Sequence, residues 1–140
     1  MEEIKQLNQV HKILDFHVTN NPDNVSVSVD RASYTNSDIF SKVLSLVGLL
    51  KENKVTSGDR IAYLAKNSSE FIELMYASCI LGLVMVPINF RLAYEEVKFI
   101  IQDSGSKIII FGEEFKELVE KLNADKTDLQ LSLVISELRN

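Results

Sequence analysis

Apolar and polar residues recur along the chain with two different periods, and these periods predict its first elements. Three valines alternate with serines between residues 25 and 29, which is the two-residue period of a strand with one face in water. Residues 33–35 are expected to pair with this strand in a short antiparallel hairpin. Five apolar residues between positions 39 and 50 recur instead at helical spacing, so a helix is predicted over about 36–53.

Beyond residue 57, strand-like and helix-like segments alternate. Strand starts near Arg60, Val84, Lys107 and Leu131 recur about every 24 residues, with a helix between each pair, and this order builds a parallel sheet. The runs 84–88 and 108–111 are apolar on both faces, so both are expected inside a sheet covered by helices. The pattern predicts an α/β fold: a doubly wound, mostly parallel sheet with helices on both faces, plus the hairpin.

The helix between the first two of these strands has predicted boundaries. Asn67 and Glu70 resemble a capping pair at its start, and Gly82 suits the left-handed residue that ends a helix. Its buried stripe is expected to consist of Phe71, Leu74, Met75, Ser78 and Leu81.

The chain is expected to form one domain, because its 140 residues match the usual domain size of about 150. Apolar residues at helical spacing predict an amphipathic helix over residues 3–19, which ends before Pro22. The expected organisation of this single α/β domain, residues 1–140, is an N-terminal helix at about 1–21, the hairpin at 22–35 and βα units at 36–136.

Composition and charge exclude several classes of partner. A net charge of -5 and the absence of a basic stripe argue against nucleic acid. The longest apolar run, 75–88, contains a glycine and a proline and is shorter than the roughly 20 residues that span a bilayer. The acidic start, Met1-Glu2-Glu3, differs from the basic start of a signal peptide. We therefore expect a cytoplasmic protein without a membrane span.

The single residues that could carry chemistry have ordinary surroundings in the sequence. His11 and His17 lack Cys, Asp or Glu residues at ligand spacing, so a packed or surface histidine is expected at both positions. Cys79 has apolar neighbours and no adjacent cation, which predicts a buried, inert thiol. We assign no catalytic residue and no metal ligand.

An ordered series of short motifs carries a family resemblance. The series covers roughly Pro22 to Phe111 and includes Tyr34-Thr35, GDRIA at 58–62, NSSEF at 67–71, VPINFRL at 86–92 and DSGSKIII at 103–110. Each motif is weakly specific, but their order and spacing resemble the N-terminal portion of the adenylate-forming acyl-CoA synthetases. These enzymes are also called the AMP-binding, or acyl/aryl-CoA ligase, family.

This resemblance implies an activity for the parent enzyme. A fatty acid or another carboxylic acid would attack the α-phosphate of ATP, and CoA would then displace AMP from the acyl-adenylate, with Mg²⁺ neutralising the triphosphate. The family's glycine-rich phosphate loop has no counterpart among the five glycines, which stand singly. The chain itself is therefore expected to be inactive and to need no cofactor. The rest of the ligase would be its partner, and surfaces left uncovered would favour a homo-oligomer.

Arg91 is the candidate site residue. The segment Asn89-Phe90-Arg91 follows a strand at the expected carboxyl edge of the sheet, where open α/β folds bind ligands. The resemblance implies that Arg91 contacts the nucleotide phosphates of CoA, although Phe90 replaces the family's frequent proline. The alternative is an ordinary loop residue in water or paired with Glu95 or Glu96.

Two other functional interpretations stay open. Amino-acid adenylating domains of peptide synthetases share these opening segments and use a carrier protein's phosphopantetheine as the thiol. The VPINFRL motif favours the CoA ligases over them. The third hypothesis is a free-standing, non-catalytic α/β binding or assembly module.

Overall fold

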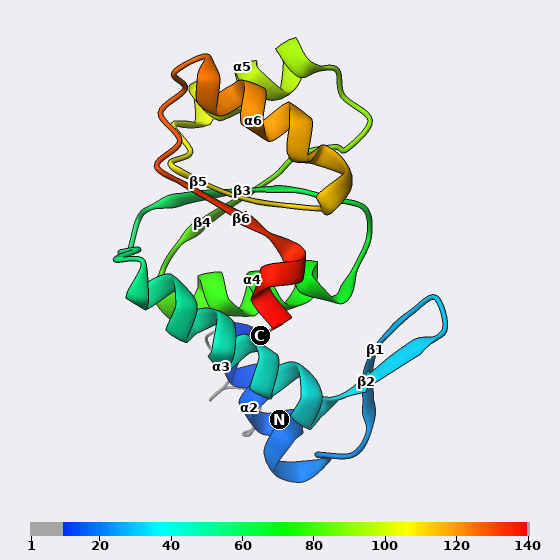
Figure 1. Ribbon diagram of the computed structural model, residues 1–140. Helices are drawn as coiled ribbons and strands as arrows, with labels where there is room; N and C mark the ends of the chain where they lie inside the picture. Colours follow the sequence, from blue (N-terminus) through cyan, green and yellow to red (C-terminus); the bar gives the residue numbers. More distant parts are fainter. Residues whose placement is uncertain (1–9, 140) are drawn as a thin grey trace. The chain divides into compact units, whose positions relative to one another are not determined.

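The computed structural model describes residues 10–139, which fall into two compact units (Figure 1). The first unit contains the described residues up to Val55 together with Ser68–Leu81. The second contains Thr56–Asn67 and the chain from Gly82 onward. Within residues 10–139, no helix combines the length and the apolar composition that crossing a membrane requires.

The first unit combines three helices with a hairpin. Its elements are α2 (Val10–Asn20), β1 (Val25–Val29), β2 (Ala32–Thr35), α3 (Asn36–Glu52) and α4 (Ser69–Leu81). The predicted hairpin is confirmed, since β1 and β2 pair antiparallel with a register shift between Val25 and Val27. The N-terminal helix is described only from Val10, and residues 3–9 of its predicted span lie outside the described residues.

A capping box fixes the start of α3. Thr35 Oγ1 accepts a hydrogen bond from the Asp38 amide at 3.1 Å, and Asp38 Oδ2 accepts one from the Thr35 amide at 2.8 Å. These hydrogen bonds from Thr35 lower the pKa of Asp38. The predicted apolar stripe is confirmed, because all five of its residues are buried: Ile39, Val43, Leu46, Val47 and Leu50.

The buried side of α4 differs from the prediction. Glu70 and Glu73 are 1% and 4% exposed, whereas the predicted stripe residues Phe71 and Met75 are only half-buried. Lys42 Nζ lies 3.4 Å from Glu73 Oε1 and compensates the charge of that carboxylate. The helix is apolar almost all round, so its apolar residues alone could not locate the buried side.

The exposure of Cys79, in the same helix, also differs from the prediction. Its side chain is exposed, so the prediction of a buried thiol is wrong. The physical reason is the orientation of α4, whose buried face contains Leu74, Ala77 and Ser78 and leaves Cys79 outside.

The second unit is built on a four-stranded parallel sheet. Its strands are β3 (Arg60–Leu64), β4 (Val84–Pro87), β5 (Ile108–Phe111) and β6 (Leu131–Val134), in the spatial order β4-β3-β5-β6. Two α-helices, α5 (Tyr94–Ser104) and α6 (Lys116–Ala124), and two 3₁₀ turns, η1 (Glu113–Phe115) and η2 (Ile135–Arg139), complete it. Ala62 lies opposite Val86 on one side and Ile109 on the other, which sets the register of β3 with β4 and with β5.

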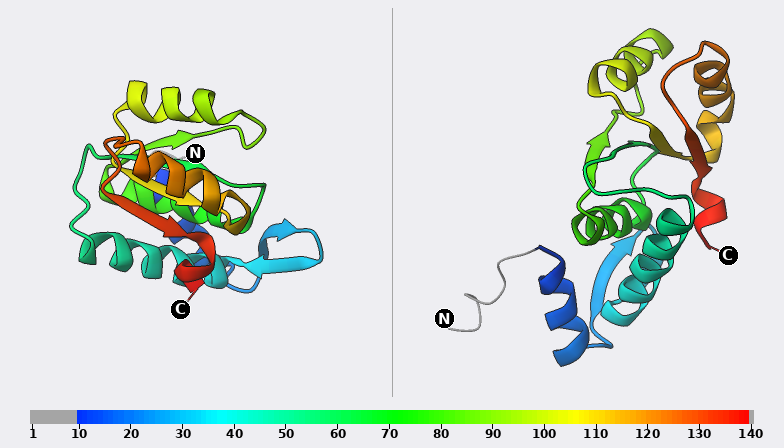
Figure 2. Two further views of the ribbon diagram at one scale, coloured as in Figure 1. Left: turned by 45° about the horizontal axis from the view of Figure 1, so that its top comes forward. Right: turned by 90° about the vertical axis from the view of Figure 1, so that its left-hand side faces the viewer.

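Helices α5 and α6 cover one face of this sheet (Figure 2). Alternate residues of the strands meet apolar residues of the two helices in a single buried cluster: Ala62, Leu64, Ile88, Val97, Ile101, Ile109, Phe111, Val119 and Leu122. The predicted α/β class is therefore confirmed as a parallel sheet flanked by helices, together with an antiparallel hairpin. That the chain forms one α/β domain stays a prediction.

Strand β4 occupies the edge of the sheet rather than its interior. Val84 is 47% exposed, and β4 pairs only with β3 among the described strands. The prediction of an interior strand holds for β5, whose four residues are all buried, and is wrong for β4. An apolar run indicates a buried strand but does not say how many neighbours it has, because pairing depends on distant residues.

Candidate functional site at the carboxyl edge of the sheet

The carboxyl ends of the four parallel strands meet at one edge of the second unit. Lys66 follows β3, the loop 89–92 follows β4, Gly112 and η1 follow β5, and η2 follows β6. Open α/β sheets bind ligands at this edge, because the loops there converge from several strands. The edge therefore contains the candidate site that the sequence predicted.

The loop 89–92 has a path fixed by local hydrogen bonds. The Ile88 amide donates to the Tyr63 carbonyl at 2.9 Å, which keeps the chain in the sheet up to that point. Asn89 Oδ1 then accepts from the Arg91 amide at 3.0 Å, and the Asn89 carbonyl accepts from the Leu92 amide at 3.1 Å. A side chain that bonds two residues ahead makes a tight turn, so Asn89 places Arg91 at the surface.

Arg91 projects from this turn into solvent. Its guanidinium carbon lies 5.3 Å from the centre of the Phe90 ring, within the range of a cation–π contact. The ion pairs within residues 10–139 do not include Arg91, so the alternative pairing with Glu95 or Glu96 is not found. An exposed arginine beside an aromatic ring suits an anionic ligand, since its planar fork can donate to two phosphate oxygens.

Glu96 has a structural partner instead. Its Oε2 accepts a hydrogen bond from the Ala93 amide at 2.8 Å, which satisfies one of the unpaired amides at the start of α5. The carboxylate also lies at the positive end of the helix dipole. This interaction links the end of the loop 89–92 directly to the first turn of α5.

Tyr94, Lys98 and Asp125 form a network beside this helix start. Tyr94 donates from its hydroxyl to Asp125 Oδ2 at 2.6 Å, and Lys98 Nζ donates to the same oxygen at 2.8 Å. Partial burial and the hydrogen bond to Asp125 raise the pKa of Tyr94 to about 12. The hydrogen bonds from Lys98 and Tyr94 lower the pKa of Asp125, and the bond to Asp125 raises the pKa of Lys98. Sequence reasoning missed this network.

The other charged groups at the edge pair with one another. Lys66 Nζ lies 3.8 Å from Glu114 Oε1 in a largely exposed ion pair. Glu113 Oε2 accepts from the Ser136 hydroxyl at 3.2 Å, which joins η1 to η2. Arg91 belongs to none of the ion pairs found within residues 10–139.

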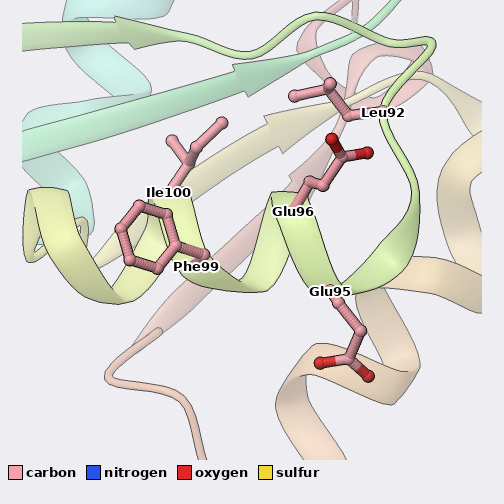
Figure 3. A pocket seen from close by; sticks show the side chains of 5 residues that line it. All are labelled: Leu92, Glu95, Glu96, Phe99 and Ile100. Atoms are coloured by element: carbon pink, nitrogen blue, oxygen red, sulfur yellow. The ribbon is translucent and has the colours of Figure 1, made fainter.

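A hollow of about 420 Å³ opens along α5, next to the loop (Figure 3). It is lined by the apolar side chains of Leu92, Phe99 and Ile100 and by Glu95 and Glu96. Phe99 is 64% exposed, which is unusual for a large aromatic residue. We did not predict this hollow. The helical spacing of residues 95, 96, 99 and 100 could have indicated it.

The two histidines lie apart from this site along the chain, in the first unit. His17 is exposed in the last turn of α2, with its ring centre 5.6 Å from that of Phe16. His11 is half-buried in the same helix. Among residues 10–139, no three His, Cys, Asp or Glu side chains gather closely enough to hold a metal ion.

Comparison with known proteins gives consistent results for sequence and structure. The model of the AMP-binding enzyme family matches residues 14–139. The fatty acid–[acyl-carrier-protein] ligase ScoC of Streptomyces coeruleorubidus is 32% identical over 85% of this chain and 23% of its own length. The long-chain-fatty-acid–CoA ligase FadD13 of Mycobacterium tuberculosis is 45% identical over 59% of this chain and 15% of its own. The chain thus spans less than a quarter of these relatives.

Solved structures agree with these matches. A crystal structure of the N-terminal domain of FACL13 from Mycobacterium tuberculosis superposes with a TM-score of 0.85 at 29% identity, over 94% of this chain and 35% of that one. The family model covers nearly the whole described chain, and the motif series at residues 58–110 lies inside it. The resemblance stated from these motifs is confirmed: the chain belongs to the family of AMP-binding enzymes, whose matched members are acyl-CoA and acyl-carrier-protein ligases.

Proposed function

We propose that this chain is an N-terminal part of an ATP-dependent fatty acid–CoA ligase that forms an acyl-adenylate and then an acyl-CoA thioester. The observation that supports this proposal most strongly is the family match over residues 14–139. The relatives named for fatty acids support the substrate class.

The role proposed for Arg91 is recognition of a CoA phosphate. The residue lies exposed on a turn fixed by Asn89, at the edge where parallel sheets bind ligands. A guanidinium bound to a phosphate forms charge-assisted hydrogen bonds with defined geometry. Arg91 would thus orient CoA rather than take part in bond making.

ATP and Mg²⁺ are proposed for the parent enzyme only. The described residues bring no three metal-ligating side chains together, and the single glycines provide no loop of successive backbone amides for a triphosphate. We therefore assign no step through ATP or Mg²⁺ to these residues. We propose accordingly that the 140-residue chain is inactive by itself.

A second candidate concerns the thiol acceptor. ScoC, which matches 85% of this chain, is named as a ligase of fatty acids to an acyl-carrier protein. The phosphopantetheine arm of such a protein carries the same thiol as CoA but lacks its adenosine phosphates. The two acceptors therefore differ in what Arg91 could contact.

Location and assembly are further parts of the proposal. The one cysteine of the chain, Cys79, is free, which suits a reducing compartment such as the cytoplasm. The rest of the ligase is the proposed principal partner, and the exposed Phe99 supports self-association of the chain when it is alone.

The proposal can be tested by pyrophosphate release from the intact protein that contains this chain. We expect release that depends on a fatty acid, ATP and Mg²⁺, and a thioester product when CoA is added. A panel of short, long and aromatic acids defines the substrate class, and holo acyl-carrier protein in place of CoA tests the second candidate. No acid-dependent release from the intact protein would contradict the proposed function. Release by the 140-residue chain alone would contradict its proposed inactivity.

A further inference from the structure

Two side chains of α5 converge on one oxygen at the end of α6. Tyr94 is the first residue of α5, Lys98 lies one turn later, and Asp125 directly follows the last residue of α6. The Tyr94 hydroxyl and the Lys98 ammonium lie 2.6 Å and 2.8 Å from Asp125 Oδ2. Both distances are typical of hydrogen bonds to a charged acceptor.

A fourth side chain closes the network from α6. Lys121 Nζ lies 3.7 Å from the centre of the Tyr94 ring, so the ring is held by its hydroxyl and by a cation over its face. Lys98 and Asp125 are only 25% and 36% exposed. A single exposed ion pair contributes little to stability. In a network of a hydroxyl, two ammonium groups and a carboxylate, each contact limits the motion of the other side chains.

The network is tied to the candidate site by short, hydrogen-bonded steps. Asn89 fixes the turn that carries Arg91, and Glu96 fixes the amide of Ala93. Tyr94 follows Ala93 directly. Little flexible chain is left between Arg91 and the network, so the position of the first turn of α5 determines where the guanidinium lies.

We propose that Tyr94, Lys98 and Asp125 form a clamp between α5 and α6 that positions the loop 89–92, and with it Arg91, for binding of the acyl acceptor. The clamp residues are positioning residues, since they act through the loop and do not touch the ligand. This inference rests on the proposed role of Arg91 in phosphate recognition.

The packing of α5 indicates which part of the helix depends on the clamp. Val97 and Ile101 are fully buried against the sheet and hold the body of the helix without the clamp. Loss of the clamp therefore frees mainly the first turn of α5 and the loop before it. We expect a local effect on the loop and little effect on the core.

The test uses Tyr94→Phe and Asp125→Ala in the intact protein. The first variant removes only a hydroxyl, and the second removes the shared acceptor. We expect the KM for CoA to rise roughly three- to tenfold in each, with kcat and the rate of acyl-adenylate formation changed by no more than about twofold. Asp125→Asn, which keeps an oxygen acceptor, is expected to recover part of the affinity. Amide exchange at residues 89–93 should become faster in Tyr94→Phe and Asp125→Ala.

Ser132→Ala provides a matched control. It removes a hydroxyl of β6 that lies 3.4 Å from the side chain of Asn123 in α6, outside the clamp. An equal rise in KM in this variant would indicate general destabilisation and overturn the positioning role. Unchanged amide exchange at 89–93 in both clamp variants would also overturn it.

Arg91→Ala separates failure of the clamp from failure of the proposed function. If Arg91→Ala leaves the KM for CoA unchanged, the phosphate role of Arg91 is wrong. The clamp is then judged by amide exchange alone, where faster exchange at 89–93 supports its hold on the loop. If Arg91→Ala raises the KM for CoA and the clamp variants do not, the phosphate role of Arg91 is supported and the positioning role of the clamp is overturned.

Discussion

Ser57 Oγ lies 2.6 Å from the position that a Cβ atom would take on Gly82. Gly82 follows α4 in the left-handed conformation, with a φ of 69°, and its carbonyl accepts a hydrogen bond from the Gly58 amide at 2.8 Å. The backbone conformation therefore favours glycine at this position, and a methyl group there would also require the Ser57 hydroxyl to move. The prediction of a left-handed Gly82 is confirmed.

Gly82→Ala is expected to destabilise the protein by at least about 1–2 kcal/mol, the cost of a left-handed conformation for a residue with a Cβ. Gly48→Ala is the matched control, because Gly48 lies inside α3 and, apart from its chain neighbours and the backbone of that helix, no atom lies within 4 Å of the position that a methyl group would take. It is expected to stabilise by about 0.5–1 kcal/mol through helix propensity. Urea unfolding of the two variants measures both values, and effects of the same sign would contradict this account.

Stability should fall in acid because of carboxylates that accept hydrogen bonds in the folded state. Hydrogen bonds from Thr35 and Thr56 hold the pKa values of Asp38 and Asp59 below the ordinary 3.8, and those from Lys98 and Tyr94 do so for Asp125. A depressed pKa contributes stability that is present above 3.8 and is lost as the pH falls through the folded-state pKa. Thermal unfolding between pH 6 and pH 2 should show this loss.

The variant Asp38→Asn/Asp59→Asn checks the origin of the acid effect. It has no carboxyl group that can be protonated at these two positions. Its Tm should therefore depend less on pH below 4 than the Tm of the unsubstituted chain. An unchanged pH dependence would assign the loss to other groups.

Tyr94 gives the opposite dependence at alkaline pH. Its pKa is raised from 10 to about 12, so its contribution is fully present below 10 and is lost as the pH rises through about 12. Tyr94→Phe has no hydroxyl to ionise. Above pH 10 its Tm should therefore decline less steeply than that of the parent chain, and an equally steep decline would show that the clamp does not contribute.

The elements that depend on local patterns could be predicted from the sequence. The five-residue apolar stripe of α3 and the strand β1 with its alternating valines each lie within a short segment, and the structure confirms this helix face and this strand, although Val25 is 62% exposed. Local hydrogen bonds and side-chain periodicity depend on neighbours in the chain, so no tertiary information is needed.

Features that depend on distant residues could not be predicted. The edge position of β4 depends on which strands pair, and the buried Glu73 depends on Lys42, 31 residues away. The Tyr94–Asp125 bond also spans 31 residues. The sequence indicated Arg91 through its loop and its family motif, whereas the clamp beside it has no local signature.

Phe99→Ser tests whether the hollow along α5 mediates self-association of the 140-residue chain. Burial of a large, exposed aromatic side chain favours contact with another surface. The unsubstituted chain is therefore expected to form a dimer or higher oligomer at tens of micromolar, and Phe99→Ser is expected to shift toward monomer. Leu44→Ser is the control, since Leu44 is 49% exposed on α3. Light scattering that shows a monomeric parent chain, or equal effects of both variants, would count against this role of Phe99.

Arg91→Ala tests the candidate site itself in the intact protein. Arg91 makes no ion pair within residues 10–139 and its turn is held by Asn89, so its loss should change stability by no more than about 0.5 kcal/mol. If Arg91 binds a CoA phosphate, the apparent affinity for CoA should weaken by roughly 1–3 kcal/mol, with acyl-adenylate formation little changed. Arg91→Lys keeps the charge but loses the planar fork and should give an intermediate value. Pantetheine, which has the thiol arm of CoA but no phosphate group, should bind the unsubstituted protein and Arg91→Ala equally. A KM for CoA that Arg91→Ala leaves unaltered would make Arg91 an ordinary solvated loop residue.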